Sequence, residues 1–405
     1  MKLQQLTWKG SHRPLARWLA SLTVAALMVA CGGGGGNASG ADGTLRVALT
    51  DAPSCGYDHI YVTVEKVRVH QSVNAGDGDA GWSELTLSPA RRVDLLSLTN
   101  GVLEELGSMP LAAGRYSQVR LVLAENSSNA PLANAAQVTG GGLVDLKTPS
   151  AQQSGLKLQA NLEVTSGQLA DLVLDFDACK SIVKAGNSGQ YILKPVVSVV
   201  PRLTTALQGY VSTSLAAGST IISAQQSGEI VRATAPDATG KFSIPYLAPG
   251  TYSLVIVSEG RSTAVLTGIP VATVTGITTI NGTSTAIAPP TSAMATVSGS
   301  VVGSGTTSLP AVNATVRALQ VLTGGPTMQL TGQGVDAASA SYTLRLPVAA
   351  PVKAAYSSSS TALTFVPDTA VAGKYTVEAQ SPGLATLAKP ADISGGQGVT
   401  LNFSY

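Results

Sequence analysis

Three segments of the chain repeat one pattern: a small residue or proline, a glycine, any residue, a tyrosine and then an extended run. They read LAAGRYSQVRLVL from Leu111, LAPGTYSLVIV from Leu247 and AVAGKYTVEAQ from Ala370. Glycine adopts turn conformations that other residues avoid, so we expect turns at Gly114, Gly250 and Gly373. The repeat therefore predicts three similar turn-and-strand units along the chain.

The tyrosine that opens each of these strands is a second constraint. A tyrosine at such a corner of a β-sandwich buries its ring and returns its hydroxyl to nearby backbone, and we expect this of Tyr116, Tyr252 and Tyr375. Strand openings also recur, as GTLRVALT from Gly43, LQGYVSTS from Leu207 and TVSGSVVGS from Thr296. Separations of more than 100 residues predict three successive sandwich-like domains.

The composition agrees with an all-β chain. Thr, Ser, Val, Gly and Ala dominate, helical periodicity is nearly absent, and short alternating runs are separated by Gly, Pro, Asn and Ser. This pattern is typical of sandwiches and small barrels. We therefore expect an all-β fold of tandem antiparallel β-sandwich domains of the transthyretin or immunoglobulin-like kind, within a length of 405 residues that suits two or three domains.

The N-terminus has the pattern of an export signal. Its basic residues are Lys2, Lys9, Arg13 and Arg17, and no acidic residue precedes Asp42. The apolar stretch 18–30 is too short for a permanent membrane span, as in a secretory signal peptide. It ends in LMVAC, which resembles a bacterial lipobox, although Met28 stands where leucine is usual. The resemblance implies lipidation of Cys31; the alternative is an ordinary cleaved signal peptide with an incidental cysteine.

Five glycines follow the cysteine at residues 32–36. Such a run holds no conformation and acts as a flexible tether. Several acyl chains on one residue anchor a protein stably. Since Gly32, not aspartate, follows Cys31, the lipoprotein resemblance implies a lipid-anchored protein of the bacterial cell envelope, sorted to the outer membrane.

The charge balance bears on partners. Loss of residues 1–30 lowers the formal net charge from +2 to −2, and no Lys/Arg cluster remains. This argues against nucleic acid as a partner. The predicted organisation is a signal peptide at 1–30, a lipidated cysteine and tether at 31–42, and β domains at 43–203, 204–289 and 290–405.

Two cysteines remain in the mature chain, Cys55 and Cys179. In an oxidising envelope we expect them to form a disulfide. Closing a loop of this length would stabilise the fold by about 4–5 kcal/mol in the chain-entropy model. The alternative is two separately buried thiols.

The second predicted domain contains LQGYVSTS, then ATAPDATGKFSIPYLAPGTYSLVIVSEG, then TGIPVATVTGITTI. The turn at Asp237 and Gly240 into Phe242, followed by Gly250 and Tyr252, is similar to the carboxypeptidase regulatory-like family. That resemblance implies a seven-stranded, transthyretin-like sandwich of the carbohydrate-binding-like superfamily. The third predicted domain is a longer, more divergent version with an insertion rich in Ser and Ala.

The first predicted domain is the most distinctive. It contains LTDAPSCGYDHIYVTVEKVRVHQ, GWSELTLSPARRVDLLSLTNG, GLKLQ, DLVLDFDACKSIV and YILKPVVSVV. This order resembles a bacterial lipoprotein family catalogued only as domain of unknown function 4382. The resemblance implies location and fold, and no known activity. Within it, the phase slip near Glu65 and Lys66 predicts a β-bulge.

Carboxylates gather near the cysteines in this first domain. Asp175 and Asp177 are two apart and so share a strand face. A Cys55–Cys179 bond would bring Asp51 and Asp58 within roughly 10–20 Å of them. Carboxylate clusters suit calcium, which predicts a divalent-ion site at Asp51, Asp175 and Asp177. The alternative is local: Asp51 and Asp177 accept backbone hydrogen bonds at turns, and Lys180 neutralises a neighbour.

No pattern indicates catalysis. His59 and His70 stand in no zinc-binding H-E-x-x-H motif, and no G-x-S-x-G elbow occurs. We therefore expect no enzyme and no cofactor other than the calcium considered above. Trp82 is the only tryptophan outside the signal segment, which favours structural modules over sugar-binding ones.

These observations predict a non-enzymatic cell-envelope lipoprotein that serves as a surface scaffold or interaction module. The alternatives are a glycan-binding lipoprotein that captures polysaccharide and an ion-dependent adhesive head. The expected partners are the membrane, through the lipid anchor, and a protein or polysaccharide.

Overall fold

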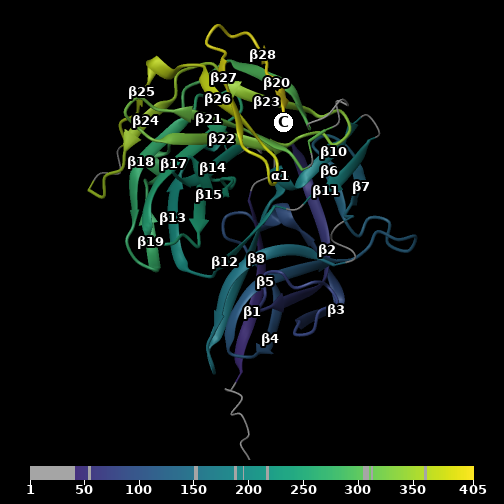
Figure 1. Cartoon of the computed structure of the whole chain (residues 1–405). Helices are drawn as coiled ribbons and strands as arrows, with labels where there is room; N and C mark the ends of the chain where they lie inside the picture. The colour runs from purple at the N-terminus through teal and green to yellow at the C-terminus, as the bar shows by residue number, and fades with distance from the viewer. Residues whose placement is uncertain are drawn as a thin grey trace, which may run out of the picture. The chain divides into compact units, whose positions relative to one another are not determined.

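The structure is a computed structural model that describes residues 42–52, 56–149, 154–186, 189–194, 196–215, 219–303, 310–311, 313–359 and 363–405; the side chains of Ala52 and Cys179 are also outside its description. Strands make up most of these residues, and they form three modules in chain order (Figure 1). No helix in the described ranges is long and apolar enough to cross a membrane.

The first module has two mixed sheets, one in the order β12-β9-β1-β4 and one in the order β10-β11-β7-β6-β2-β5-β8 with β3 beside β2. Its elements are β1 (Gly43–Ala52), β2 (Tyr57–His70), β3 (Ser83–Asp94), η1 (Leu95–Leu98), β4 (Glu104–Leu111), β5 (Gly114–Leu123), β6 (Ala135–Val138), β7 (Leu143–Lys147), β8 (Leu156–Val164), β9 (Leu169–Asp177), α1 (Ala178–Ser181), β10 (Ile182–Ala185), β11 (Gln190–Leu193) and β12 (Val197–Pro201).

The second module packs the sheet β16-β13-β19 against the sheet β15-β14-β17-β18-β24-β25. Its elements are β13 (Thr204–Tyr210), η3 (Thr213–Leu215), β14 (Thr220–Gln226), β15 (Glu229–Thr234), β16 (Lys241–Pro245), β17 (Gly250–Ser258), β18 (Ala264–Val271), β19 (Thr275–Thr279), η4 (Thr283–Thr285), β24 (Val352–Ala355) and β25 (Val366–Pro367).

The third module packs β23-β20-β28, with β29 also on β20, against β22-β21-β26-β27. Its elements are β20 (Met294–Val302), β21 (Thr315–Val321), β22 (Thr327–Gly334), β23 (Ser341–Pro347), η5 (Thr369–Val371), β26 (Lys374–Gln380), β27 (Leu387–Asp392), β28 (Val399–Thr400) and β29 (Phe403–Ser404).

One seven-strand plan recurs in all three modules. The first strand of each, β1, β13 or β20, pairs antiparallel with β4, β16 or β23 and parallel with β9, β19 or β28. The strand that carries the G-x-Y pattern, β5, β17 or β26, lies inside the opposite sheet. The internal repeat seen in the sequence is therefore a repeated sandwich.

The predicted all-β fold of tandem β-sandwiches is confirmed, and its sheets are mixed, because every module contains parallel as well as antiparallel pairs. The chain enters each module on a central strand, leaves the sheet for the opposite one, and returns to the free side of that central strand. A return after several crossings brings the last strand in parallel to the first.

The second module also takes two strands from the segment predicted to belong to the third domain. The Ser/Ala-rich insertion supplies β24, which pairs parallel with β18, and β25, which pairs with β24 (Figure 1). Val352 and Ala354 of β24 join the apolar core of the second module. The boundary at residue 290 therefore separates two modules that share chain.

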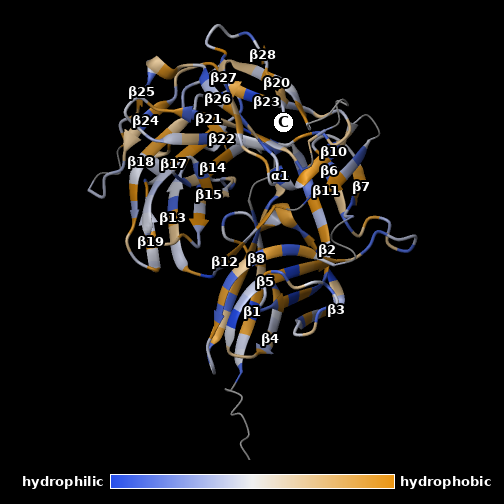
Figure 2. Ribbon diagram, in the orientation of Figure 1, coloured by the Kyte–Doolittle hydropathy of each residue, from blue (hydrophilic) through white to orange (hydrophobic). Residues whose placement is uncertain are grey.

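Alternation of side chains builds the cores. Along β8 and β23, buried and exposed residues alternate, and hydropathy alternates along β8 in the same way (Figure 2). Because successive strand residues face opposite sides, each sheet presents one apolar face to its partner. The predicted bulge is confirmed: β2 shifts register between Val64 and Lys66, and β14 and β21 shift at comparable places.

Burial is confirmed for all three corner tyrosines, and the return of the hydroxyl to nearby backbone is confirmed for Tyr116 and Tyr252. The hydroxyl of Tyr116 donates to the carbonyl of Ala112, and that of Tyr252 donates to Ala248 at 2.8 Å. Tyr375 is as buried but donates to Pro347, far away in sequence. Each ring thus fills its core while its polar end keeps a hydrogen bond.

The glycines before these tyrosines differ. Gly114 and Gly373 have φ of 153° and 64°, as the turn prediction requires, whereas Gly250 is not among the glycines with positive φ. A Cβ at Gly250 would lie 2.7 Å from Nε2 of Gln226, so a side chain there would require the flexible end of Gln226 to move aside.

Removing one corner hydroxyl should destabilise the protein measurably. Tyr252→Phe keeps the ring but leaves the carbonyl of Ala248 without this donor, and we expect the free energy of unfolding to fall by about 1 kcal/mol. Urea denaturation measures this. Tyr61→Phe is the control, since the ring of Tyr61, which contacts His59 and Arg92, is retained. Equal stability of Tyr252→Phe and the unaltered chain would contradict the corner's role.

Candidate functional site

Two of the sequence-based site predictions concern residues outside the described part of the chain. Cys31 and Cys55 lie there, and of Cys179 only the backbone, in α1, is described. Lipidation of Cys31 and a Cys55–Cys179 disulfide therefore stay predictions.

The acidic residues proposed for calcium lie on neighbouring strands. In the parallel pair β1–β9, Asp51 is in register with Phe176 and Ala52 with Asp177. Residues in register point to the same face of a sheet, so Asp51 points to the opposite face from Asp175 and Asp177. Asp58 is exposed and accepts from the amide of Gly140. Among the described side chains, no three His, Cys, Asp or Glu residues are placed to hold a metal ion.

Asp177 has the local role offered as the alternative. Its Oδ1 accepts from the amide of Lys180 at 3.1 Å and caps α1, while its Oδ2 lies 2.9 Å from Nζ of Lys180. The predicted neutralisation by Lys180 is therefore confirmed. A calcium site at these carboxylates stays a prediction.

Asp175 instead joins the first module to the second. Its Oδ2 lies 2.6 Å from Nη1 of Arg232 on β15, and both side chains are nearly buried. Burial raises the pKa of the Asp175 carboxyl to about 6, although the Arg232 guanidinium opposes the rise. The two modules thus meet at a carboxylate that binds a proton more readily than usual.

This carboxyl should make stability depend on pH in a recognisable way. Because the folded protein binds the Asp175 proton more tightly than the unfolded chain, the stability contributed by this group falls as pH rises from about 4 to about 6. The shift amounts to about 3 kcal/mol. We expect the unaltered chain to gain that much relative to Asp175→Asn as the pH is lowered through this range.

Chemical denaturation of both proteins at several pH values measures the difference. Asp58→Asn, the same chemical change at an exposed position, is the control. A constant stability difference between Asp175→Asn and the unaltered chain across the range would refute the assignment.

A second contact joins the same two modules. Asn100, at φ 60° in the turn after η1, accepts from the amide of Ser243 at 3.0 Å and from the hydroxyl of Thr234 at 3.0 Å. The backbone amide of Asn100 donates to the hydroxyl oxygen of Thr234 at 2.9 Å. The side chain of one turn residue thus hydrogen-bonds to both β15 and β16.

The second and third modules meet through a buried amide. Nε2 of Gln225 donates to the carbonyl of Gln329 at 2.7 Å, and the amide of Gln329 donates to Oε1 of Gln225 at 2.8 Å. Around it lies an apolar cluster from both modules, formed by Val255, Val265, Leu322 and Met328. The side chain of Gln225 therefore replaces a backbone pairing partner for β22.

The first and third modules meet at a turn that has a counterpart in the second. Asp237 bonds the amides of Thr239 and Lys241 in the predicted turn before β16. In the third module Asp336 forms the equivalent turn and also accepts from the amide of Gly186 at 2.9 Å. A local turn motif has thus become an intermodule contact.

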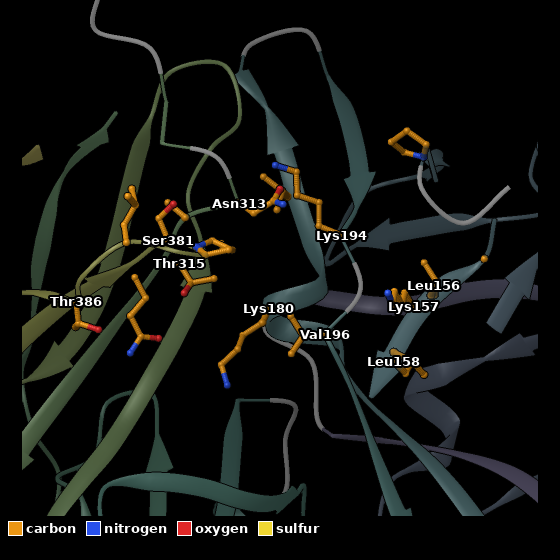
Figure 3. A pocket seen from close by; sticks show the side chains of 18 of the residues that line it. Leu156, Lys157, Leu158, Lys180, Lys194, Val196, Asn313, Thr315, Ser381 and Thr386 are labelled. Atoms are coloured by element: carbon orange, nitrogen blue, oxygen red, sulfur yellow. The ribbon is translucent and has the colours of Figure 1, made fainter. Parts of the chain in front are cut away.

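Next to this last contact lies a cleft of about 870 Å³. One wall comes from the start of β8, α1 and the segment after β11; the other comes from the ends of β21 and β26 (Figure 3). Lys157, Lys180 and Lys194 line the first wall, and no Asp or Glu is among the described lining residues. We call this site the lysine cleft.

The lysines of the cleft differ in environment. Lys180 is paired with Asp177, and Lys157 is exposed on β8. Partial burial lowers the pKa of Lys194. The segments GLKLQ and YILKP, which contain Lys157 and Lys194, show no binding motif in sequence, because only the folded chain brings them together.

Residues considered for catalysis or sugar stacking have structural contacts. Nδ1 of His59 lies 2.6 Å from Oδ2 of Asp94, and His70 packs on Trp82. The Trp82 ring also carries the guanidinium groups of Arg68 and Arg120, at 4.6 and 4.8 Å from its centroid. Its faces are therefore used within the first module.

Residues 42–195 match the family described as Domain of unknown function (DUF4382). This confirms the resemblance predicted for the first domain, and the first module is similar to that family. No curated protein matches the chain. The carboxypeptidase regulatory-like resemblance of the later modules stays a prediction.

Solved structures found to be similar to parts of this chain include three from bacteria. A cohesin–X-dockerin complex from Acetivibrio cellulolyticus has 21% identity over 20% of this chain and 55% of its own, with a TM-score of 0.17. The Bacillus anthracis TIE protein has 11% identity over 90% of this chain and 50% of its own, with a TM-score of 0.18. A streptococcal ancillary pilin has 10% identity over 89% of this chain and 99% of its own, with a TM-score of 0.16. The chain spans about half the length of the first two.

Proposed function

We propose that this chain is a non-enzymatic, lipid-anchored scaffold of the bacterial cell envelope, whose three sandwiches form one rigid support for an interaction made at its surface. The observation that carries the proposal is that each pair of modules is joined through buried or partly buried polar contacts: Asp175–Arg232, Gln225–Gln329 and Gly186–Asp336. Residues 40–405 accordingly form a single compact unit.

Contacts of this kind hold modules in one arrangement. A buried amide or carboxylate that loses its partner costs more than an exposed one, so separation of the modules is unfavourable. Flexible tandem domains meet through smaller, more hydrated surfaces and move relative to one another. A scaffold that presents a site between modules requires that the modules stay in one arrangement.

Cooperative unfolding tests the rigid support. We expect the full chain to unfold in one calorimetric transition. Gln225→Ala removes both bonds to Gln329 and leaves its buried backbone groups unpaired, so the free energy of unfolding should fall by about 3 kcal/mol. Gln226→Ala, at the exposed neighbouring position, is the matched control. Separate transitions for the modules of the unaltered chain would refute the scaffold.

Anchoring is tested independently at the cysteine. In cells fed labelled palmitate, the unaltered chain should incorporate label and sediment with membranes, and Cys31→Ser should do neither because it lacks the thiol that receives the lipid. Cys55→Ser is the control and should still be labelled. Membrane association of Cys31→Ser equal to that of the unaltered chain would contradict the anchor.

A further inference from the structure

The lysine cleft is a concentration of positive charge in a chain whose mature part is predicted to be slightly negative. Three ammonium groups line its wall in the first module, and among the ion pairs of the described residues only Lys180 has a carboxylate partner, Asp177. The uncompensated charge comes from Lys157 and Lys194. In a partly desolvated cleft such charge attracts an anion more strongly than it would on an open surface.

Lys194 is partly desolvated in the cleft wall. Its side chain is partly buried and burial lowers its pKa, so its charged form is destabilised there. An anion placed beside Nζ would relieve that cost. In Figure 3 the side chains of Lys180 and Lys194 extend from the first module toward the wall that carries Asn313 and Thr315.

The facing wall is neutral and polar. Asn313, Thr315, Gln380 and Thr386 bring amides and hydroxyls to the cleft. Such groups both donate and accept hydrogen bonds, as do the hydroxyl groups of a sugar. A ligand complementary to both walls therefore has anionic groups on one side and hydroxyls on the other.

Apolar side chains complete the lining. Val196 and Leu384 are 38% and 52% exposed, and both line the cleft. They offer contact for the C–H faces of a ring. The volume of about 870 Å³ lies in the range of small-ligand sites, and it is large enough for a few sugar units.

We propose that the lysine cleft binds an acidic oligosaccharide, a short chain of sugars bearing carboxylate groups. The carboxylates lie against Lys157 and Lys194, and the hydroxyls face Asn313, Thr315 and Gln380. This deepens the proposed function by naming its ligand class, and it rests on that function in one respect: the cleft exists only while the first and third modules stay together.

Two other anionic ligands fit the cleft less well. An acidic peptide added as a strand needs a longer edge, and only the first three residues of β8 line the cleft, Leu156 to Leu158. A single-stranded nucleic acid gains affinity by stacking bases on aromatic rings, and none is among the described lining residues.

Isothermal titration of the full chain with trigalacturonate tests the proposal. We expect binding that is at least tenfold tighter than that of maltotriose, the uncharged control, and that weakens as salt is raised. Lys157→Gln and Lys194→Gln should each weaken binding about tenfold, and the double variant about a hundredfold. Lys241→Gln, the same change on the second module, should leave the affinity within twofold.

A comparison of polygalacturonate with trigalacturonate distinguishes a long polysaccharide ligand from a short oligosaccharide. Tighter binding of polygalacturonate than of the trimer, at equal sugar concentration, would assign an extended polysaccharide, and equal binding would assign a short one. Equal binding of trigalacturonate and maltotriose, tighter binding of triglutamate, or unchanged affinity in the double variant would overturn the proposal.

Failure of this inference is distinguishable from failure of the scaffold. If trigalacturonate does not bind while the chain still unfolds in one calorimetric transition, the ligand assignment is wrong and the scaffold stands. If the modules unfold separately, the scaffold is wrong, and trigalacturonate is then expected not to bind.

Discussion

Each sandwich depends on a single strand that is paired on both edges. β1, β13 and β20 each hold an antiparallel partner on one side and a parallel partner, from the far end of the module, on the other. The parallel pairing is made across a long stretch of chain, and it closes the module around its core. Gly299 on β20 shows how tight this closure is, since a Cβ there would lie 1.9 Å from the carbonyl of Leu401. The remaining strands are arranged around this central ladder.

Much of this plan is predictable from sequence because it is written in local signals. The G-x-Y segments, the strand openings at Gly43, Leu207 and Thr296, and the slip at Glu65 and Lys66 each correspond to a strand, a corner or a bulge. What sequence does not contain is which distant strands meet. The parallel closures, and the pairing of β24 with β18, depend on competition among strands of similar composition, and no short pattern marks the winner.

In the candidate site, too, contacts between residues close in sequence could be predicted and contacts between distant segments could not. Asp177 and Lys180 are three residues apart, so their pairing follows from local geometry and was predictable. Lys157 on β8 and Lys194 just after β11 are brought to one wall by the folded chain, opposite side chains from the third module. The partner of Asp175 is likewise 57 residues away, on another module. When charged residues come together only in the folded protein, their spacing in the sequence does not indicate that they meet.

Because β24 and β25 come from the segment of the third module and complete a sheet of the second, the order in which the modules can fold during synthesis is constrained. Synthesis proceeds from the N-terminus, and domains usually fold as they emerge. The second module cannot follow that order, because the edge of β18 stays uncovered until residues 352–367 have emerged, most of the way through the third module. An uncovered edge pairs readily with other chains. The second and third modules must therefore mature together, and a chain cut between them at residue 290 would have an adhesive edge in place of a finished domain.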